Sequence, residues 1–224
     1  MQKDGLIQRP SPRRLHPQTN ILIRVETAPQ ESIHLPVHEL PRLQLRQVGD
    51  RADLRLWNEY IHRYHYLGHK AQPGAQLRYW VSAADHLVTL LGFGAAAWLC
   101  TPSNKLIGWT HELRQKYLHL VVNNARFLIL PWVCSDNLTS KVLGLAAKQL
   151  AGDWLLRYGY RPLLLKTFVE INRFNGTCYR AANWNQVGKT QGRAKLGSAG
   201  KQSVPIKSIW LYLLQHNFKC RLTG

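Results

Sequence analysis

Acidic side chains are scarce in this sequence. Its 224 residues include 12 Asp and Glu against 30 Lys and Arg, which gives a formal net charge of +18. The shortage is greatest in the second half, where only Asp136, Asp153 and Glu170 follow Glu112. A metal-dependent nuclease site needs two or more carboxylates close together. We therefore predict no metal site, and the sequence leaves the cofactor open.

Cysteine pairs and long apolar runs are also missing. The four cysteines are widely scattered and form no C-x-x-C pair, which excludes a zinc ribbon and a dithiol redox motif. The longest apolar run, Leu87 to Cys100, is interrupted by Gly92 and Gly94 and is too short to cross a bilayer. The N-terminus shows no secretory leader. These absences predict a cytoplasmic chain with reduced thiols and no membrane partner.

Positive charge is abundant on a chain that is otherwise typical of a folded protein. Hydrophobic residues make up 45% of it, and it has eight Trp, which argues against a disordered basic tail. The sequence pI is about 10.2, and clustered Lys and Arg gain free energy by displacing counterions from phosphates. We therefore expect a nucleic-acid partner. A merely basic, soluble surface is the alternative.

The chain divides into two parts by composition. Residues 1–45 are rich in Pro, Arg, Gln and His without helical or strand periodicity, which predicts an extended basic arm. Residues 46–224 carry the periodic patterns of one α/β domain. The predicted elements are a helix over 53–68, a strand hairpin over 76–83 and 87–99 with a glycine bulge in its second strand, a helix over 112–122, a strand over 127–133, a helix over 138–158, a strand over 163–169, a short helix over 176–182 and a strand pair from 184 onward.

This order of elements is similar to the second half of GNAT-type N-acetyltransferases, and residues 172–184 resemble the last segment of that family in arrangement. The resemblance implies an α/β (α+β) fold with a GNAT-like mixed, mostly antiparallel sheet flanked by helices. Coenzyme A binding in such a fold needs a glycine-rich loop at a helix N-terminus. Residues 134–141 contain no glycine and include Asp136, so we predict that acetyl-coenzyme A is not a ligand.

A closer resemblance rests on six ordered segments. They are residues 64–68 (YHYLG), 77–79 (LRY), 107–109 (IGW), 123–133 (NNARFLILPWV), 173–184 (RFNGTCYRAANW) and 187–193 (VGKTQGR). They resemble the DruA family of Druantia anti-phage systems, whose members also include transposase-like proteins of mobile elements. The resemblance implies DNA-related biology. Members have a glutamate where this chain has Lys166, so an activity that needs that acid would be lost here or would need a partner.

Polar residues of these segments are expected to meet at the ends of adjacent strands, where open sheets commonly form a ligand crevice. His65 can serve as a general base or a phosphate contact, because imidazole titrates near neutral pH. The alternative is an oriented histidine of the core or of a groove. For the other residues, the structural alternative is that Asn123 and Asn183 cap turns and Arg126 pairs with Glu170. The candidates for catalysis are His65, Asn124, Arg126, Glu170, Tyr179 and Asn183.

The candidates for nucleic-acid binding are cations in the same segments and in the glycine-rich tract that follows. The tract from Gly188 to Ser203 has four cations, four glycines and no acid, which suits close contact with a phosphate backbone. A solvated loop is the alternative. Aromatic residues between 57 and 80 can stack on bases wherever they are exposed. The predicted contacts are Arg78, Lys189, Arg193, Lys195 and Lys201.

Together these patterns predict a nucleic-acid-binding protein of a phage-defence or mobile-element system, with DNA favoured over RNA and with other subunits of that system as partners. The alternative is a GNAT-like transferase that acts on an amine of a nucleotide, RNA or protein. A third interpretation is a structural subunit of a helicase assembly. Stabilisation by coenzyme A or a nucleotide would favour the transferase, and co-purification would favour the subunit.

Overall fold

Seven strands and four helices make up the part of the chain that the structure, a computed structural model, describes: residues 25–96, 109–192 and 204–215. The strands are β1 (Leu43–Gln47), β2 (Gln76–Ala83), β3 (His86–Ala95), β4 (Val121–Ile129), β5 (Leu164–Glu170), β6 (Asn185–Lys189) and β7 (Lys207–Leu213). The helices are α1 (Arg51–Tyr64), α3 (His111–Tyr117), α4 (Leu138–Tyr158) and α5 (Thr177–Ala181), with 3₁₀ turns η1 (Val25–Thr27) and η2 (Leu118–Leu120).

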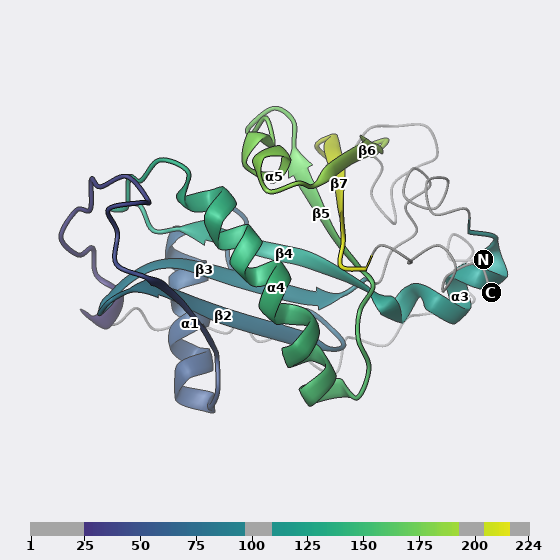
Figure 1. The fold of residues 1–224 in the computed structure, drawn as a ribbon, viewed down its shortest axis with the longest axis horizontal. Coiled ribbons are helices and arrows are strands. Elements are labelled where there is room, and N and C mark those ends of the chain that lie inside the picture. The colour runs from purple at the N-terminus through teal and green to yellow at the C-terminus, as the bar shows by residue number, and fades with distance from the viewer. Residues whose placement is uncertain (1–24, 97–108, 193–203, 216–224) are drawn as a thin grey trace, which may run out of the picture.

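The strands form one sheet in the order β1-β2-β3-β4-β5-β7-β6 (Figure 1). Every neighbouring pair is antiparallel except β4 and β5, which run parallel. Helix α4 covers one face of β2, β3 and β4, and α1 lies on the other face (Figure 1). The predicted fold class, a mixed and mostly antiparallel sheet flanked by helices, is confirmed.

Local sequence explains where the two long helices begin and end. Asp50 accepts a hydrogen bond from the N–H of Asp53 and thereby caps α1, as a short acidic side chain does at this position. Helix α4 ends at Gly159, which adopts a left-handed conformation with φ 79° that glycine tolerates without strain. The predicted bounds of α4 and of β2 are confirmed to the residue.

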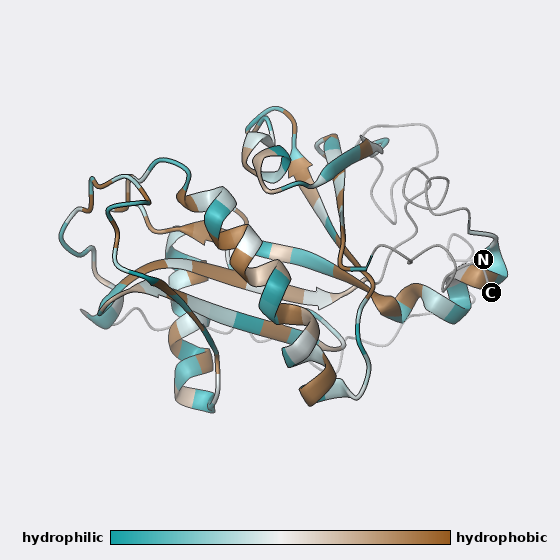
Figure 2. Cartoon of the chain, viewed as in Figure 1, coloured by the Kyte–Doolittle hydropathy of each residue, from teal (hydrophilic) through white to brown (hydrophobic). Residues whose placement is uncertain are grey.

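The central strands and both helices enclose the core. Strand β3 is buried on both faces from Val88 to Gly94, as expected for a strand with a helical layer on each side. Trp154 of α4 and Trp57 of α1 are 0% and 3% exposed. Figure 2 shows the apolar segments along β3, β5 and β7 and the hydrophilic ones on the outer loops. No helix among the described residues is both long and apolar enough to cross a membrane.

The parallel pair separates after four residues. Strand β4 pairs with β5 from Val121 to Asn124, opposite Leu164 to Thr167. Beyond that point β4 continues beside β3, and β5 continues beside β7, so the two parts of the sheet diverge (Figure 1). Ala125 is an extra residue in β4 at the same place, since Gly92 pairs with Arg126 and Phe93 with Asn124. A bulge of this kind bends a strand.

Several expected boundaries are wrong. The helix expected over 112–122 ends at Tyr117, and residues 123–126, expected before a strand, lie inside β4. A bulge was expected at the glycines of the second hairpin strand. Strand β3 has its extra residue at Val88, where Val81 pairs with Thr89 and Ser82 with Leu87. At Gly92 the extra residue is Ala125 of β4. Strand β1, which no pattern indicated, pairs with β2.

Part of the segment expected as a basic arm packs on the domain. Thr27 is fully buried and donates a hydrogen bond to Glu59 of α1, and Tyr60 donates to the backbone oxygen of Glu26 at 2.9 Å. The N–H of Ile33 donates to the backbone oxygen of Trp132 at 2.8 Å. Residues 1–24 lie outside the described part of the chain.

Candidate functional site

A cleft of about 600 Å³ opens where β4 and β5 diverge. Its walls come from β4, β5, the end of α1, the first turn of α4 and the loop that leads into α5. Among the described residues that line it, none is acidic. The polar and aromatic residues of the lining are Tyr64, His65, Tyr66, Asn124, Phe127, Thr139, Thr167, Phe168, Arg173, Phe174, Asn175, Thr177 and Tyr179.

The floor of the cleft is a network of buried polar groups. Tyr179 donates from its hydroxyl to Oδ1 of Asn124 at 2.9 Å. The amide of Asn124 donates to the backbone oxygen of Arg126 at 3.2 Å and to that of Gly92 at 3.4 Å, so it spans the bulge. Burial raises the pKa of Tyr179, which keeps the phenol protonated and able to donate. Buried groups bonded in this way hold a fixed orientation.

The mouth of the cleft is aromatic and cationic. Tyr66 and Phe174 are 39% and 48% exposed, and their ring centroids are 5.5 Å apart. The guanidinium of Arg173 lies 4.7 Å from the Tyr66 ring centroid, a cation–π distance. The His65 ring stacks on the Tyr66 ring, with the ring centroids 4.9 Å apart and an interplanar angle of 25°. Tyr66, Phe174 and Arg173 therefore place flat, exposed groups at the entrance.

His65 is neutral at physiological pH. Burial, and then the charge of Arg126, lowers the pKa of His65 to about 4. Its Nδ1 accepts a hydrogen bond from the N–H of Leu67 at 3.2 Å, which places the ring proton on Nε2. A base with so low a pKa removes protons inefficiently at pH 7. The side chain therefore suits orientation of the segment that follows α1 and donation from Nε2 better than general-base catalysis.

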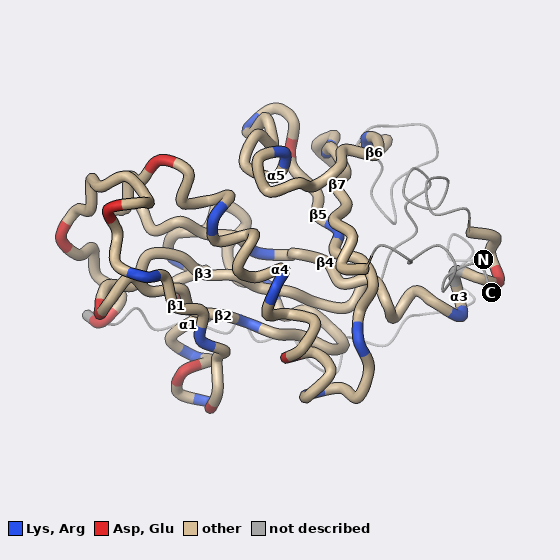
Figure 3. Tube along the Cα trace, viewed as in Figure 1, with Lys and Arg blue, Asp and Glu red and all other residues tan. Residues whose placement is uncertain are grey.

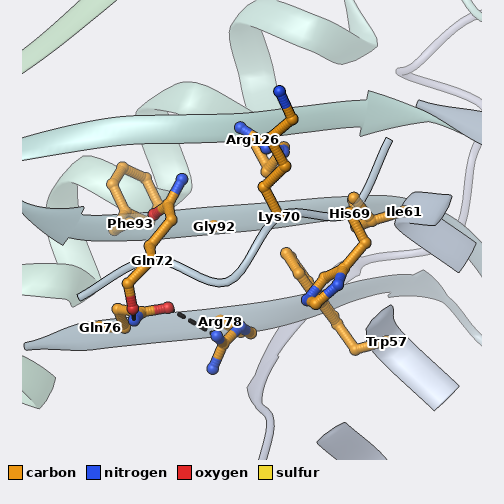
Figure 4. A pocket seen from close by; sticks show the side chains of 10 residues that line it. All are labelled: Trp57, Ile61, His69, Lys70, Gln72, Gln76, Arg78, Gly92, Phe93 and Arg126. Carbon is orange, nitrogen blue, oxygen red and sulfur yellow. Dashed lines mark hydrogen bonds between the residues drawn. The ribbon is translucent and has the colours of Figure 1, made fainter. Parts of the chain in front are cut away.

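The cleft brings together three of the six residues predicted for catalysis, His65, Asn124 and Tyr179. Arg126 lines a separate hollow on the α1 side of the sheet (Figure 4). Glu170 ends β5, half-buried and opposite Lys207, and forms no ion pair with Arg126 within the described residues. Asn183 is exposed in a left-handed turn with φ 62°, which agrees with the alternative that it caps a turn.

The residues predicted for nucleic-acid contact lie in different places. Arg78 lies in β2 and lines the same hollow as Arg126. Lys189 is exposed at the end of β6. Lys166, where the resemblance implied an acid, is 3% exposed, with its Nζ 5.2 Å from the Phe168 ring centroid. The remaining three predicted contacts, Arg193, Lys195 and Lys201, lie outside the described residues.

Most residues of the cleft were not among the candidates from the sequence, and Phe174, Thr139 and Thr167 are examples. Phe174 is an aromatic residue between Arg173 and Asn175 in a polar loop, and that contrast is a signal for an exposed contact residue. Thr139 and Thr167 line the cleft from α4 and β5, and a threonine in a helix or a strand carries no signal of its own. Of the aromatic residues considered for stacking, Tyr66 is exposed, whereas Trp57, Tyr60, Tyr79 and Trp80 are buried.

Comparison with protein families shows to which family this chain belongs. A family model described as Druantia protein DruA matches residues 2–208. The chain belongs to the DruA family. The resemblance read from the six sequence segments is therefore confirmed, and membership in a Druantia defence-system family supports a role in phage defence. No curated protein matches the chain.

Solved structures that resemble this DruA-family chain are acetyltransferases, in agreement with the predicted GNAT-like arrangement. A chimera of spermidine N-acetyltransferase SpeG from Vibrio cholerae with hSSAT is 12% identical, with a TM-score of 0.47, and the match covers 81% of this chain and 98% of that one. Aminoglycoside acetyltransferase AAC(6')-Ib in complex with coenzyme A and kanamycin is 13% identical, with a TM-score of 0.49 and coverage of 82% and 100%. An N-acetyltransferase from Staphylococcus aureus is 9% identical, with a TM-score of 0.45 and coverage of 77% and 98%.

Proposed function

We propose that this DruA-family chain binds nucleic acid during phage defence and takes an unpaired nucleotide into the cleft between β4 and β5. The observation that carries the proposal is the exposed pair Tyr66 and Phe174, with Arg173 over the Tyr66 ring, at the mouth of a cleft of about 600 Å³. In the described part of the chain, no acidic residue lines this cleft. DNA is the proposed nucleic acid, and other subunits of the defence system are the proposed protein partners.

Aromatic and cationic groups at one entrance suit an unpaired base. Proteins that bind single strands combine a positively charged groove with aromatic side chains on which bases stack. A base inside a duplex is inaccessible to such a cleft until it is unstacked and turned out. The buried hydroxyl and amide groups of the floor lie deeper than the aromatic mouth, where they can meet the polar edge of a base.

The charge distribution favours the same partner. Figure 3 shows most Asp and Glu positions on the N-terminal segment, α1 and outer loops, and one acidic position beside α5. The cleft itself carries Arg173 and no acid among its described lining residues. Burial, and then the charge of Glu170 at the end of β5, raises the pKa of Tyr66, so a phosphate chain at the mouth meets one carboxylate as well as Arg173. Cations along the path of the chain gain free energy by releasing condensed counterions.

Group transfer to an amine is the second candidate. One observation favours it: the buried Asn124 and Tyr179 lie at the floor of the cleft, and Thr139 of the first turn of α4 lines the same cleft. The absence of glycine in residues 134–141 and the presence of Asp136 disfavour coenzyme A as the donor. Thermal unfolding in the presence of coenzyme A and of a nucleotide, measured separately, distinguishes this candidate from simple binding.

The test is fluorescence anisotropy with a labelled single-stranded DNA and a duplex of equal length. The double substitution Tyr66→Ala and Phe174→Ala is expected to weaken single-strand binding at least tenfold, because one stacked base contributes about 1–3 kcal/mol. Leu156→Ala, which removes a side chain that is 87% exposed on α4, is the matched control and should bind as the parent chain does. Equal affinity of the double variant and the control would remove the cleft from the interface. Tighter binding of an RNA strand than of DNA would replace DNA as the partner.

A further inference from the structure

Two arginines flank a glycine in a row across three strands on the α1 side of the sheet. Arg78 of β2 pairs with Gly92 of β3, and Gly92 pairs with Arg126 of β4. Paired residues of neighbouring strands present their side chains on the same face. Since neighbouring strands lie about 4.8 Å apart, the backbones of the two arginines are about 10 Å apart. Gly92 has no side chain, and the Trp57 ring packs over it, with Cη2 3.0 Å from the place of an added Cβ. The two arginines and this ring border a small hollow (Figure 4).

Two further cationic or titratable side chains complete the border. His69 and Lys70, which follow α1, lie over the row (Figure 4). Lys70 is exposed and His69 is half-buried. The Trp57 ring closes the bottom, with the guanidinium carbon of Arg78 at 5.4 Å from its centroid. The free space is about 10 Å³, enough for about one water-sized atom.

No carboxylate balances these charges within the described part of the chain. Arg78 donates to Oε1 of Gln76 at 2.5 Å, and Arg126 donates to the backbone oxygens of Ala125 at 2.7 Å and Gly68 at 3.3 Å. All three acceptors are neutral. By contrast, the more exposed Arg46 binds both carboxylate oxygens of Asp53, at 2.8 and 3.1 Å.

The unbalanced pair is costly without a ligand. Burial lowers the pKa of Arg78 and of Arg126, because partial desolvation disfavours a charged guanidinium. Half-buried charges are normally paired with an opposite charge. An anion in the hollow would supply that charge.

We propose that Arg78, Arg126, His69 and Lys70 form a binding site for a phosphoryl group. One phosphoryl oxygen fits the hollow between the arginines, and the other oxygens face the exposed Lys70. Planar guanidinium groups bind phosphate oxygens through paired N–H donors. Binding of a phosphoryl group stands on this geometry alone, whereas its assignment to the backbone of a nucleic acid rests on the proposed function.

The position of the site favours a nucleic-acid phosphate over a free one. Arg126 donates to the backbone oxygen of Gly68, which lies in the segment of residues 65–70 that follows α1. His65 and Tyr66 of this segment line the cleft. His69 and Lys70 of the same segment line the hollow of the proposed phosphoryl site. A strand whose base enters the cleft would carry a phosphate toward the arginines.

The experiment uses the full chain and two probes, inorganic phosphate and the labelled single-stranded DNA. Calorimetric titration of the parent chain with phosphate against a chloride background of equal ionic strength should show one saturable site. Arg78→Gln and Arg126→Gln should each weaken phosphate binding about tenfold or more, because each removes a charge-assisted donor. Arg55→Gln removes one exposed charge from α1 and should leave phosphate binding unchanged. No saturable phosphate binding by the parent chain overturns the site, whatever the variants do.

The DNA probe separates the two parts of the proposal. A parallel loss of phosphate and DNA affinity in both arginine variants, with unchanged behaviour of the Arg55 control, supports a backbone phosphate as the ligand. Loss of phosphate affinity with unchanged DNA affinity keeps the phosphoryl site and overturns its assignment to nucleic acid. If Arg126→Gln fails to fold, Arg126→Lys keeps the charge but removes the planar fork. Unchanged phosphate affinity of that variant then overturns the role assigned to the guanidinium.

Discussion

Tyr179 donates its hydroxyl proton to Oδ1 of Asn124 across 2.9 Å, and this bond joins the two parts of the diverging sheet. Asn124 is the last residue of β4 that pairs with β5, and Tyr179 belongs to α5, which follows β5. The same asparagine donates to the backbone on both sides of the bulge at Ala125. One side chain thus fixes the bulge, the point of divergence and the floor of the cleft.

Tyr179→Phe should lower the free energy of unfolding by about 1–3 kcal/mol, because it leaves the buried Oδ1 of Asn124 without its donor. Denaturant unfolding measures the change. Tyr212→Phe is the matched control, since the Tyr212 hydroxyl, in β7, makes no hydrogen bond within the described residues and its loss should change stability little. Equal effects of the two substitutions would contradict a structural role for the Tyr179 hydroxyl.

The layered fold followed from periodicity. Alternation in residues 76–83 and helical spacing in residues 138–158 reproduced β2 and α4 to the residue. The start of β4 did not follow, because Asn123, Asn124 and Arg126 are polar and depleted in strands. Tertiary pairing with β3 and β5 overrides that preference. Strand β1 was missed because it follows a proline-rich segment that lacks a pattern of its own.

Only part of the cleft between β4 and β5 could be predicted from the sequence. His65, Asn124 and Tyr179 were found through family segments, and they meet because β4 and β5 diverge beside the end of α1. The separation of Arg126 from them depends on the face of β4 that each side chain occupies, which the one-residue bulge at Ala125 changes. A sequence pattern that does not show the bulge cannot assign that face.

Stability should fall as the pH decreases from about 6.5 toward 4. The pKa of His65 is about 4 in the folded chain, through burial and then the charge of Arg126, and the unfolded value is about 6.5. Between these values the unfolded state binds more protons, so stability increases with pH in this window. The contribution is fully present above about 6.5 and amounts to at most about 3 kcal/mol. Denaturant unfolding at a series of pH values measures it.

His65→Asn is the control for this pH dependence. The Asn oxygen can accept the hydrogen bond from Leu67 that Nδ1 accepts, but the side chain does not titrate. The variant should lose part of the pH dependence and keep the remainder, because burial also lowers the pKa of His69, with Arg78 and Arg126 as further causes. An identical pH profile for parent and variant would show that His65 does not titrate as described.

Two glycine substitutions should have opposite effects on stability. Gly176 has φ 70°, and an added Cβ would lie 2.6 Å from a Trp210 ring atom, so Gly176→Ala should destabilise by about 2–5 kcal/mol through backbone strain and overpacking. Gly152, inside α4, has nothing within 4 Å of an added Cβ, so Gly152→Ala should stabilise by about 0.5–1 kcal/mol. Thermal unfolding of both variants checks the signs. A stabilising Gly176→Ala would contradict the close packing of Gly176 against the Trp210 ring.

The cations of the glycine-rich tract from Gly188 to Ser203 should determine how strongly DNA affinity depends on salt. Each cation that contacts a phosphate of duplex DNA adds about −0.9 to the slope of log affinity against log salt, and about −0.7 for a single strand. Lys189→Gln, Arg193→Gln, Lys195→Gln and Lys201→Gln, combined in one variant, should therefore weaken binding similarly for all sequences and flatten the slope by about one unit per contact that is lost. Anisotropy titrations at several salt concentrations measure both quantities.

A control variant separates contact from net charge. Arg51→Gln, Arg55→Gln, Lys141→Gln and Lys148→Gln remove the same number of charges from exposed positions on α1 and α4. The control should lower affinity slightly through the weaker overall field but should keep the slope, because counterion release depends on cations that meet phosphates. If both variants flatten the slope equally, the tract has no contact of its own and the net charge carries the effect. A flattened slope in the tract variant alone places its cations against the phosphate chain.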